Sequence, residues 1–480
     1  MLSRRAFLSA LAASSATTLA HAQSANELSP TVLRIERRSI EVNGKPASVF
    51  GVRQPDGTFG IRTEVGKRFR VRLENKIDEP SLIHWHGLTP PWQQDGVPGV
   101  SGPPIAPGAS ADYDFPLRFG GTFWMHSHQG FQQQLLMASP LIIRDQRDRA
   151  DQQEVIIMLA DFSFTPPEQI FAELKKSGMP SMSGASSPSA APTKGVGTPG
   201  MSRAPGMAMD KPDLNDVKYD AFLANDRTLA DPEVVKVEPG GRVLLRVINS
   251  SSMSAFHVDL GALDGELIAV DGFRTVPVRG RRFPIAVAQR LDIRLVIPRA
   301  AAAHPVLALL EGDNKQTGII LRVGDTPVAR ISDRANVASP TLTLDLESRL
   351  RALEPLKPRK ANRVHTLNLT GEMAGYRWSL NNVSWSKDVP PLPIAQGERV
   401  ELVFVNQTRM PHPMHLHGHE FQVVEIDGKR FAGAVRDTVP VPPGRRVVVA
   451  FDANNPGLWA LHCHLLYHLE AGMFTTLRYV

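Results

Sequence analysis

One pattern of hydrophobic and polar positions recurs three times along the chain. A glycine opens each copy, a strand of alternating apolar and mostly Arg-rich polar positions follows, and an asparagine closes it. The copies are Gly66–Asn75, Gly241–Asn249 and Gly397–Asn406. Alternation with a period of two indicates β-strands that bury one face. Their similar spacing predicts three β-sandwich domains of similar size.

Length and composition agree with an all-β chain of several domains. A chain of 480 residues is too long for one ordinary core. Its 39 prolines and 37 glycines, with few long helical periodicities, indicate many turns. We predict domains at residues 30–148, 152–326 and 340–480. The second contains a low-complexity insertion, 177–213, which carries five methionines and which we expect to be mobile.

The first 22 residues have the features of an export signal. Arg4 and Arg5 precede a mildly apolar run, and Ala20-His21-Ala22 offers a cleavage site. The paired arginines are typical of a twin-arginine signal, and a general secretory signal that carries two arginines is the alternative. We expect a periplasmic or otherwise exported protein. The run is too short to span a membrane, so no membrane span is expected.

Charge and cysteine content narrow the partners. The formal net charge is +6, and the basic residues are scattered, so we expect no nucleic-acid partner. Cys463 is the single cysteine of the sequence, which excludes an internal disulfide. It lies between two histidines, which favours a metal or redox role.

Histidines follow the recurring asparagine. In the first and third copies a histidine lies nine residues later, at His84 and His415, and in the middle copy an isolated His257 lies eight residues later. The first and third units also share a second segment, Gly121–His128 and Gly457–His464. The middle unit lacks this segment and is predicted to hold no metal.

Ten of the fifteen histidines fall into four clusters. They are His84 and His86; His126 and His128; His412, His415 and His417; and His462, His464 and His468. Residues i and i+2 of a strand share a face, so each His-x-His presents two imidazoles side by side. Four such pairs predict an eight-imidazole cage between domains. Imidazole suits copper, iron, nickel and zinc.

Cys463 points to the opposite face from its two histidine neighbours. With His412, His468 and a more distant Met473, it offers the Cys, two His and weak axial Met of a blue electron-transfer copper. An electron accepted there needs to cross one residue to reach the imidazole cage.

At these motifs the chain resembles a three-domain multicopper oxidase of the laccase and bacterial cuprous-oxidase kind. The segments 84–87, 126–128, 412–419 and 462–473 match the family's four copper motifs in order, and the resemblance covers nearly the whole mature chain. It implies three consecutive cupredoxin-like Greek-key β-sandwich domains and four copper ions. It also implies one-electron oxidation of a substrate coupled to four-electron reduction of dioxygen to water.

The resemblance assigns a ligand set to each copper. The type 1 copper would be held by His412, Cys463, His468 and Met473; the type 2 copper by His84 and His415; and the type 3 pair by His86, His126, His128, His417, His462 and His464.

Two acids are candidates for proton delivery. The family has an acid after the first motif, and Asp95 lies nine residues past His86. An ordinary turn residue before Gly96 is the alternative. A common bacterial variant has an acid directly after the last type 1 histidine, where this chain has Leu469 followed by Glu470, so the role of Glu470 stays open.

Other candidate ligands receive a structural interpretation. His21, His257, His304 and His365 are expected to be structural. His419 is expected, at most, to contact a metal ligand without binding the metal itself. Met137 lies where Met473 lies in the third unit, but Ser127 and Gln132 replace the cysteine and histidine. We therefore expect Met137 to be a core residue, and the chain to hold one type 1 copper.

The reductant stays open between phenols or aromatic amines and Cu(I). Export and the methionine-rich segment favour Cu(I), although the segment can equally be a plain linker. Two other functions are considered. One is a copper-resistance protein that acts mainly by binding copper, and the other is a non-catalytic scaffold. The complete ligand set argues against the scaffold. A two-domain nitrite reductase is disfavoured because its sites do not use eight cage histidines. We expect a monomer.

Overall fold

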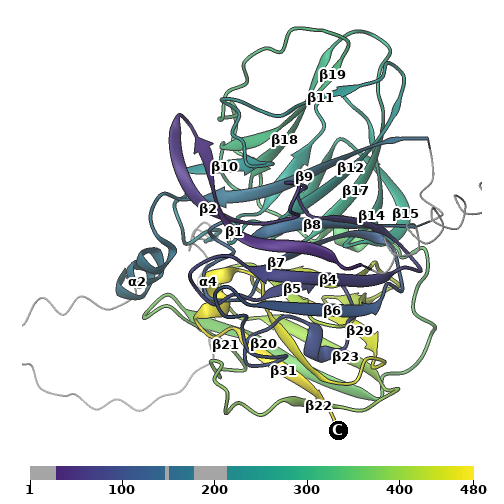
Figure 1. Ribbon diagram of the computed structural model, residues 1–480. Helices are drawn as coiled ribbons and strands as arrows, with labels where there is room; N and C mark the ends of the chain where they lie inside the picture. The colour runs from purple at the N-terminus through teal and green to yellow at the C-terminus, as the bar shows by residue number, and fades with distance from the viewer. Residues whose placement is uncertain (1–28, 146–150, 178–212) are drawn as a thin grey trace, which may run out of the picture.

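The computed structural model describes residues 29–145, 151–177 and 213–480. Nearly all regular structure in these residues is β, which confirms the all-β prediction, and the strands form six sheets (Figure 1). The predicted signal 1–22 lies outside the described residues, and so does the predicted insertion 177–213 except for its two end residues. Within the described part of the chain, no helix is long and apolar enough to cross a membrane.

The first unit is a sandwich of two four-stranded sheets. One has the order β2 (Lys45–Arg53), β1 (Thr31–Val42), β4 (Arg68–Asn75) and β6 (Ser110–Pro116). The other has the order β3 (Ile61–Glu64), β8 (Ala138–Arg144), β7 (Gly121–Ser127) and β5 (Ile83–His86). Apolar side chains from both sheets form one shared core. A short 3-10 helix, η1 (Trp92–Gln94), follows β5.

The middle unit has a six-stranded and a five-stranded sheet. The first has the order β10 (Ala221–Ala224), β9 (Gln153–Phe162), β12 (Arg242–Asn249), β17 (Arg290–Val296), β14 (Gly265–Val270) and β15 (Phe273–Gly280). The second has the order β11 (Val234–Val237), β19 (Gln316–Val323), β18 (Ala303–Leu310), β13 (Phe256–Asp259) and β16 (Arg282–Ile285). Helix α2 (Pro167–Ser177) follows β9.

The third unit repeats this plan after the short helix α3 (Asp345–Arg349). One sheet has the order β21 (Arg377–Leu380), β20 (Arg363–Glu372), β23 (Arg399–Asn406), β29 (Arg446–Asp452), β25 (Phe421–Ile426) and β26 (Lys429–Arg430), with β27 (Val435–Arg436) also paired to β25. The other has the order β22 (Leu392–Ile394), β31 (Phe474–Tyr479), β30 (Leu458–Cys463), β24 (His412–Leu416) and β28 (Thr438–Val441). Helix α4 (Leu466–Glu470) follows β30.

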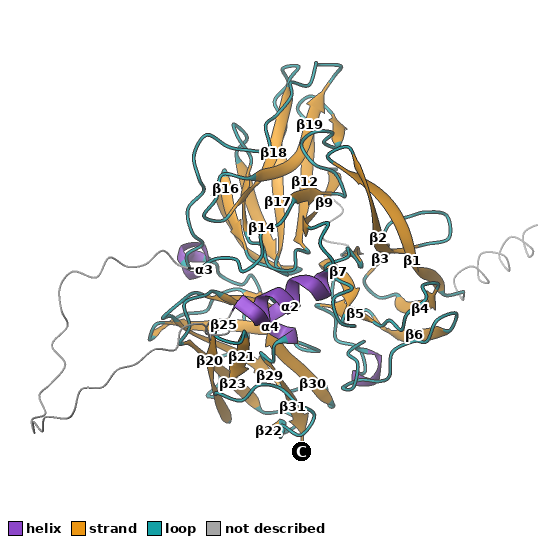
Figure 2. Cartoon of the chain, turned by 90° about the vertical axis from the view of Figure 1, so that its left-hand side faces the viewer, coloured by secondary structure: helices purple, strands orange, loops and turns teal. Residues whose placement is uncertain are grey.

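Strand pairing shows that the sequence repeat is a repeat of topology. Each recurring strand, β4, β12 or β23, lies parallel to the first strand of its unit, β1, β9 or β20. In each opposing sheet an early short strand lies parallel to the last strand, as β3–β8, β11–β19 and β22–β31. Figure 2 shows the middle unit standing above the other two. The domain boundaries at 30–148, 152–326 and 340–480 stay predictions.

The recurring asparagine has one structural task in all three units. The side-chain amide of Asn75 donates to the carbonyls of Glu79 and Ile105, both at 2.9 Å. Asn249 and Asn406 make the equivalent pair of bonds in their units. One bond closes the turn after the strand, and the other ties that turn to a neighbouring segment. The asparagine therefore fixes where the next strand, with its histidine, begins.

The expected burial of one strand face holds for β4 and is wrong for β12. In β4 the alternate residues Phe69, Val71 and Leu73 are buried. In β12 both faces are buried, including Arg246, which pairs with Glu154 and Asp292. The reason is that β12 also lies against β7 of the first unit. The interface between units therefore covers the face that the alternation assigned to solvent.

Candidate metal centres

The four His-x-His segments converge between the first and third units. In the first unit β5 pairs with β7 so that His84 lies opposite His126. In the third unit β24 pairs with β30 so that His415 lies opposite His462. The histidines therefore come from equivalent pairs of adjacent strands, and each strand contributes its second imidazole at or just beyond its end.

The eight rings form a buried cage with nitrogens at metal-binding separations. His84 Nε2 lies 3.4 Å from His415 Nε2, and His417 Nε2 lies 2.9 Å from His462 Nε2. Sets of three whose ring nitrogens lie within 4.8 Å of one another are His84, His86 and His126; His84, His415 and His417; and His128, His417 and His462. The eighth ring, His464, lies with its centroid 5.0 Å from those of His86 and His126.

Unpaired nitrogens in this cage fit bound metal ions. Four buried ring nitrogens have no hydrogen-bond partner, namely His86 Nδ1, His126 Nε2, His128 Nε2 and His464 Nε2. Buried polar atoms normally have hydrogen-bond partners, so four unpartnered nitrogens at one place indicate a bound ligand. Imidazole nitrogen is a common ligand of copper and of zinc. The donor set therefore fits several metal ions held between the two units.

Burial keeps these imidazoles in the form that binds metals. It lowers the pKa of six of them well below the usual range, and it lowers the pKa of His462 to about 4. The six are His86, His126, His128, His415, His417 and His464. The neighbouring rings add repulsion between positive charges. Neutral imidazoles have free lone pairs at neutral pH, as metal ligation requires.

A second group of candidate ligands lies on the other side of β30. We call it the thiol group; it consists of His412, Cys463 and His468. Cys463 Sγ lies 3.5 Å from His412 Nδ1 and 3.9 Å from His468 Nδ1, and the two Nδ1 atoms are 3.2 Å apart. Met473 is fully buried, and its backbone carbonyl accepts the N–H of Cys463 at 3.1 Å. Burial raises the pKa of the Cys463 thiol, so the thiolate needs a positive partner to form. A metal ion between the three side chains supplies that charge.

The two groups are joined through Cys463 by two routes. His462 and His464 are its covalent neighbours and face the cage. In addition, His462 Nδ1 donates a hydrogen bond of 2.9 Å to the carbonyl of Cys463. The thiol group and the cage are therefore connected through one residue of backbone and one hydrogen bond.

Asp95 lies against the cage, as a proton-delivering acid requires. It follows η1, and its carbonyl accepts from His84 Nδ1 while its Oδ2 accepts from His417 Nδ1, both at 2.8 Å. A Cβ at Gly96 would meet the Ile83 carbonyl at 1.9 Å, so only glycine allows this close turn. Asp95 is buried, and its Oδ1 has no hydrogen-bond partner.

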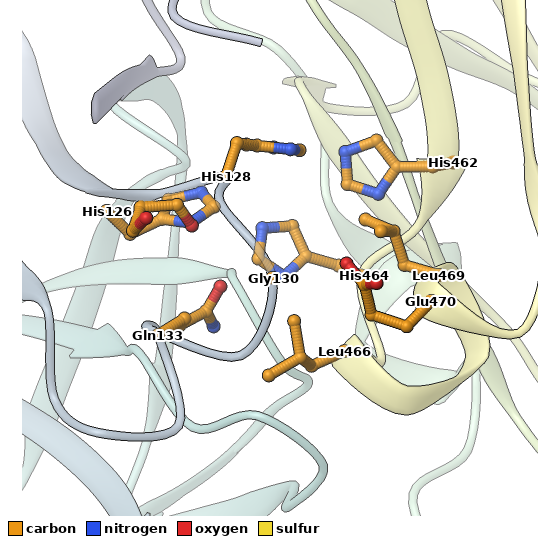
Figure 3. A pocket seen from close by; sticks show the side chains of 10 residues that line it. His126, His128, Gly130, Gln133, His462, His464, Leu466, Leu469 and Glu470 are labelled. Carbon is orange, nitrogen blue, oxygen red and sulfur yellow. The ribbon is translucent and has the colours of Figure 1, made fainter. Parts of the chain in front are cut away.

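Glu470 lines a small cavity beside the cage. The cavity has a volume of about 10 Å³, room for about one water molecule. Figure 3 shows Glu470 and Leu469 on the third-unit side of this cavity, with cage histidines of both units around it. Burial raises the pKa of Glu470. Glu470, whose role the sequence left open, therefore lies next to the cage. It does so although it is two residues past His468 instead of directly after it.

Sequence reasoning missed two residues that cover the thiol group. Asp216 Oδ2 accepts from His468 Nε2 at 3.0 Å and from the Tyr376 hydroxyl at 2.7 Å, and its side chain is fully buried. On the other ligand, Thr408 Oγ1 lies 2.7 Å from His412 Nε2. Asp216 is 252 residues away from His468 in the sequence, and no motif marks it.

Sequence reasoning also missed an acid and a base at the cage. Asp437 Oδ1 accepts from His86 Nε2 at 3.0 Å, and its carbonyl accepts from His415 Nδ1 at 2.9 Å. Arg290, from the middle unit, pairs with this carboxylate. Neither residue belongs to a histidine motif, so the sequence carries no signal for them.

Three of the remaining described histidines make ordinary structural contacts, and the fourth, His304 in β18, has a buried Nε2 without a hydrogen-bond partner. His257 and His365 each bond to a proline carbonyl at 3.0 Å, and His419 contacts the His417 carbonyl at 3.1 Å and the Tyr479 hydroxyl at 2.7 Å. None of the described histidines outside the four clusters belongs to a metal-competent group. His21 lies outside the described residues.

Comparison with known proteins identifies the family. Family models described as multicopper oxidase match residues 35–148, 153–323 and 358–480. The multicopper oxidase MmcO of Mycobacterium tuberculosis is 30% identical over 445 residues, which cover 88% of this chain and 81% of that protein. A copper resistance protein A homolog of Pseudomonas syringae pv. tomato is 28% identical, with 99% of both chains covered.

Solved structures agree with this likeness at the level of the fold. Fet3p, a multicopper oxidase that functions in iron import, superposes with a TM-score of 0.75 at 21% identity, covering 93% of this chain and 90% of that one. The laccase of Botrytis aclada also gives 0.75, at 22% identity, with 93% and 86% covered. These likenesses confirm the predicted cupredoxin-like fold. On the family matches and the 30% identical relative, the chain belongs to the multicopper oxidases, copper enzymes that oxidise a substrate with dioxygen.

Proposed function

We propose that this protein couples one-electron oxidation of a reductant at a type 1 copper to four-electron reduction of dioxygen to water at a three-copper site between the first and third units. The observation that carries the proposal is the junction at Cys463. Its thiol belongs to one ligand group, while its two neighbours, His462 and His464, belong to the other. When bound, copper supplies the one-electron redox chemistry at the thiol group and the dioxygen chemistry in the cage.

The ligand set that we propose totals four copper sites. The type 1 site takes His412, Cys463, His468 and Met473. The type 2 site takes His84 and His415, whose Nε2 atoms lie 3.4 Å apart. The type 3 pair takes His86, His126, His128, His417, His462 and His464, which include all four unpaired nitrogens of the cage.

The protein's own groups keep most of the cage imidazoles neutral. Burial lowers the pKa of seven of the eight, which keeps these seven rings unprotonated. Protons for water formation must therefore come from other groups. Asp95 is a candidate because one of its carboxyl oxygens accepts from His417 and the other, 3.3 Å from His84 Nδ1, has no hydrogen-bond partner. Glu470 is a second candidate because it lines the adjacent cavity.

The reductant is a phenol, an aromatic amine or Cu(I). Asp216, an acidic residue bonded to His468 Nε2, lies beside the proposed type 1 site. This favours a cation such as Cu(I) and also a hydrogen-bond donor such as a phenol or amine. The name of the copper resistance protein A homolog, which covers 99% of this chain, supports Cu(I) as the physiological reductant. We further propose export to the periplasm by the twin-arginine signal in residues 1–22, and a monomer.

Oxygen consumption tests the proposal. Copper-loaded protein, matched in copper content, is given either a phenol or Cu(I), and dioxygen uptake and peroxide are measured together. We expect four electrons to be consumed per dioxygen, without released peroxide, and a higher rate with Cu(I). Two electrons per dioxygen, with peroxide accumulating, would refute four-electron reduction.

A further inference from the structure

Asp437 fixes the orientation of one cage histidine. It lies between β27 and β28, fully buried, and its Oδ1 accepts a hydrogen bond of 3.0 Å from His86 Nε2. The Nδ1 of the same ring is one of the unpaired nitrogens of the cage. A carboxylate can only accept, so it keeps the proton on Nε2 and leaves the Nδ1 lone pair for a metal.

Asp95 and Asp437 occupy equivalent positions on opposite sides of the cage. Each binds one histidine of its own unit through its carbonyl and one histidine of the other unit through its carboxylate. The two acids differ in their second carboxylate oxygen. Oδ1 of Asp95 has no hydrogen-bond partner, whereas Oδ2 of Asp437 is paired with Arg290.

Arg290 uses every donor that it has. It opens β17 of the middle unit and is fully buried. Nη1 donates to Asp437 Oδ1 at 2.8 Å and to the Ala288 carbonyl at 3.0 Å. Nη2 donates to Asp437 Oδ2 and to the Asp271 carbonyl, and Nε donates to the Thr122 carbonyl at 3.2 Å. All five N–H groups of the guanidinium are thus engaged.

The ion pair is packed closely against the backbone of the first unit. A Cβ at Gly87 would lie 2.7 Å from Arg290 Nη2, from Asp437 Oδ2 and from the ring of Phe123. Gly87 also has φ +88°, which disfavours other residues. Gly87 directly follows His86, so the histidine, the acid and the arginine are packed as one block.

Charge explains why an arginine is needed there. A carboxylate buried without a cation is strongly destabilised, and a bidentate guanidinium offsets that cost while fixing the plane of the carboxylate. A lysine would supply the charge but not the second parallel hydrogen bond or the bonds to three carbonyls. The carboxylate that orients His86 therefore depends on the middle unit.

We propose that Arg290 is a positioning residue of the three-copper site: it holds the Asp437 carboxyl group in the orientation that directs His86 Nδ1 into the cage. The inference rests on the proposed copper assignment. It gives the middle unit, for which no copper ligand is proposed, a part in building the cage. It also separates the two acids, because both carboxyl oxygens of Asp437 are bonded to Arg290, whereas Oδ1 of Asp95 has no hydrogen-bond partner.

Copper reconstitution of variants tests the proposal. Arg290→Met, Arg290→Lys and Asp437→Asn apoproteins are loaded with copper and dialysed against a chelator. Copper per chain, the blue colour of the type 1 site and the electron paramagnetic resonance spectrum are then recorded. We expect the blue colour to stay and the cage to bind copper roughly 10- to 100-fold more weakly, with Arg290→Lys less affected than Arg290→Met. The spectrum should show cage copper in an altered environment.

Arg246→Lys is the matched control. Arg246 is also a buried, ion-paired arginine, and it lies on β12 beside β17. We expect it to lower the unfolding temperature of the apoprotein without changing cage copper. Wild-type cage affinity and spectra in Arg290→Met or Asp437→Asn would overturn the proposal. Equal copper loss in Arg246→Lys and Arg290→Lys at equal loss of stability would also overturn it. If copper-loaded wild-type protein were not blue, the proposed copper assignment itself would be refuted.

Discussion

At the position of the proposed type 1 site, the first and third units share the same local backbone hydrogen bonds and carry different side chains. In the third unit Met473 donates its N–H to the His468 carbonyl and accepts from the N–H of Cys463. In the first unit Met137 makes the same two backbone bonds with the residues at the equivalent positions, Gln132 and Ser127. The backbone of the proposed type 1 site is therefore present in both units.

The difference lies in whether the side chains satisfy one another. In the first unit Ser81 Oγ and Ser127 Oγ both donate to Gln132 Oε1 at 2.7 Å, and Ser81 Oγ also contacts Met137 Sδ at 3.2 Å. The Gln132 amide nitrogen in turn donates to the Glu79 carboxylate at 3.1 Å and to the Pro80 carbonyl at 3.0 Å. In the third unit the ring nitrogens and the thiol face one another without such a network. The backbone alone does not make a copper site; the three donor side chains do.

Cys463→Ser gives the third unit the chemistry of the first and should have the largest effect. A serine hydroxyl is a poor ligand for copper, so we expect one copper per chain and the blue colour to be lost while the cage stays occupied. Turnover should fall by more than about 100-fold, the upper range for loss of an indirect metal contact. Copper analysis, visible absorption and oxygen uptake measure this. A blue, active variant would mean that Cys463 is not the type 1 ligand.

Asp95→Asn should show that this first-unit acid takes part in dioxygen reduction at the cage and not in electron transfer from the substrate. We expect dioxygen reduction to slow by about 100-fold, the lower range for loss of a general acid. The amide keeps the shape of the side chain, so cage copper should be retained. Anaerobic stopped-flow reduction of the blue band by substrate should keep its rate. Slower bleaching would contradict the assignment of Asp95 to the cage.

The reverse exchange is a graft of three donors into the first unit. Ser81→His, Ser127→Cys and Gln132→His, made in the Cys463→Ser background, should restore one copper per chain and a blue colour. The background matters because the remaining colour can then come only from the grafted site. A graft that folds, as judged by circular dichroism, but binds no additional copper would show that the first-unit backbone is not equivalent.

Met473→Leu should have a smaller effect than any of these changes. An axial thioether is a weak, long ligand, so we expect copper to stay and the reduction potential to rise. Redox titration of the blue band measures the shift, and copper analysis provides the control. A colourless, copper-free Met473→Leu protein would mean that the residue has a larger structural role.

The fold and the clustering of the candidate ligands could be predicted because their signals are local. Period-two strands, a recurring asparagine and His-x-His spacing are each contained within ten residues, and the structure brings the predicted histidines into two groups. Asp216, Asp437 and Arg290 could not be predicted. Their partners lie 147 to 351 residues away, and a single acid between strands or a single arginine in a strand looks like any surface residue. The double-sided burial of β12 was missed for the same reason, since it depends on a contact between units.

Met137→Leu should have the smallest effect and tests whether the first-unit site is only core. Met137 is fully buried in the first-unit core, and its sulfur contacts Ser81 Oγ. A swap of similar volume usually costs less than about 1.5 kcal/mol of unfolding free energy. Denaturant unfolding of the apoprotein measures that cost, while copper content and the blue band should not change. Loss of copper in Met137→Leu would mean that the first unit binds metal at this position, and the contrast between the two units would fail.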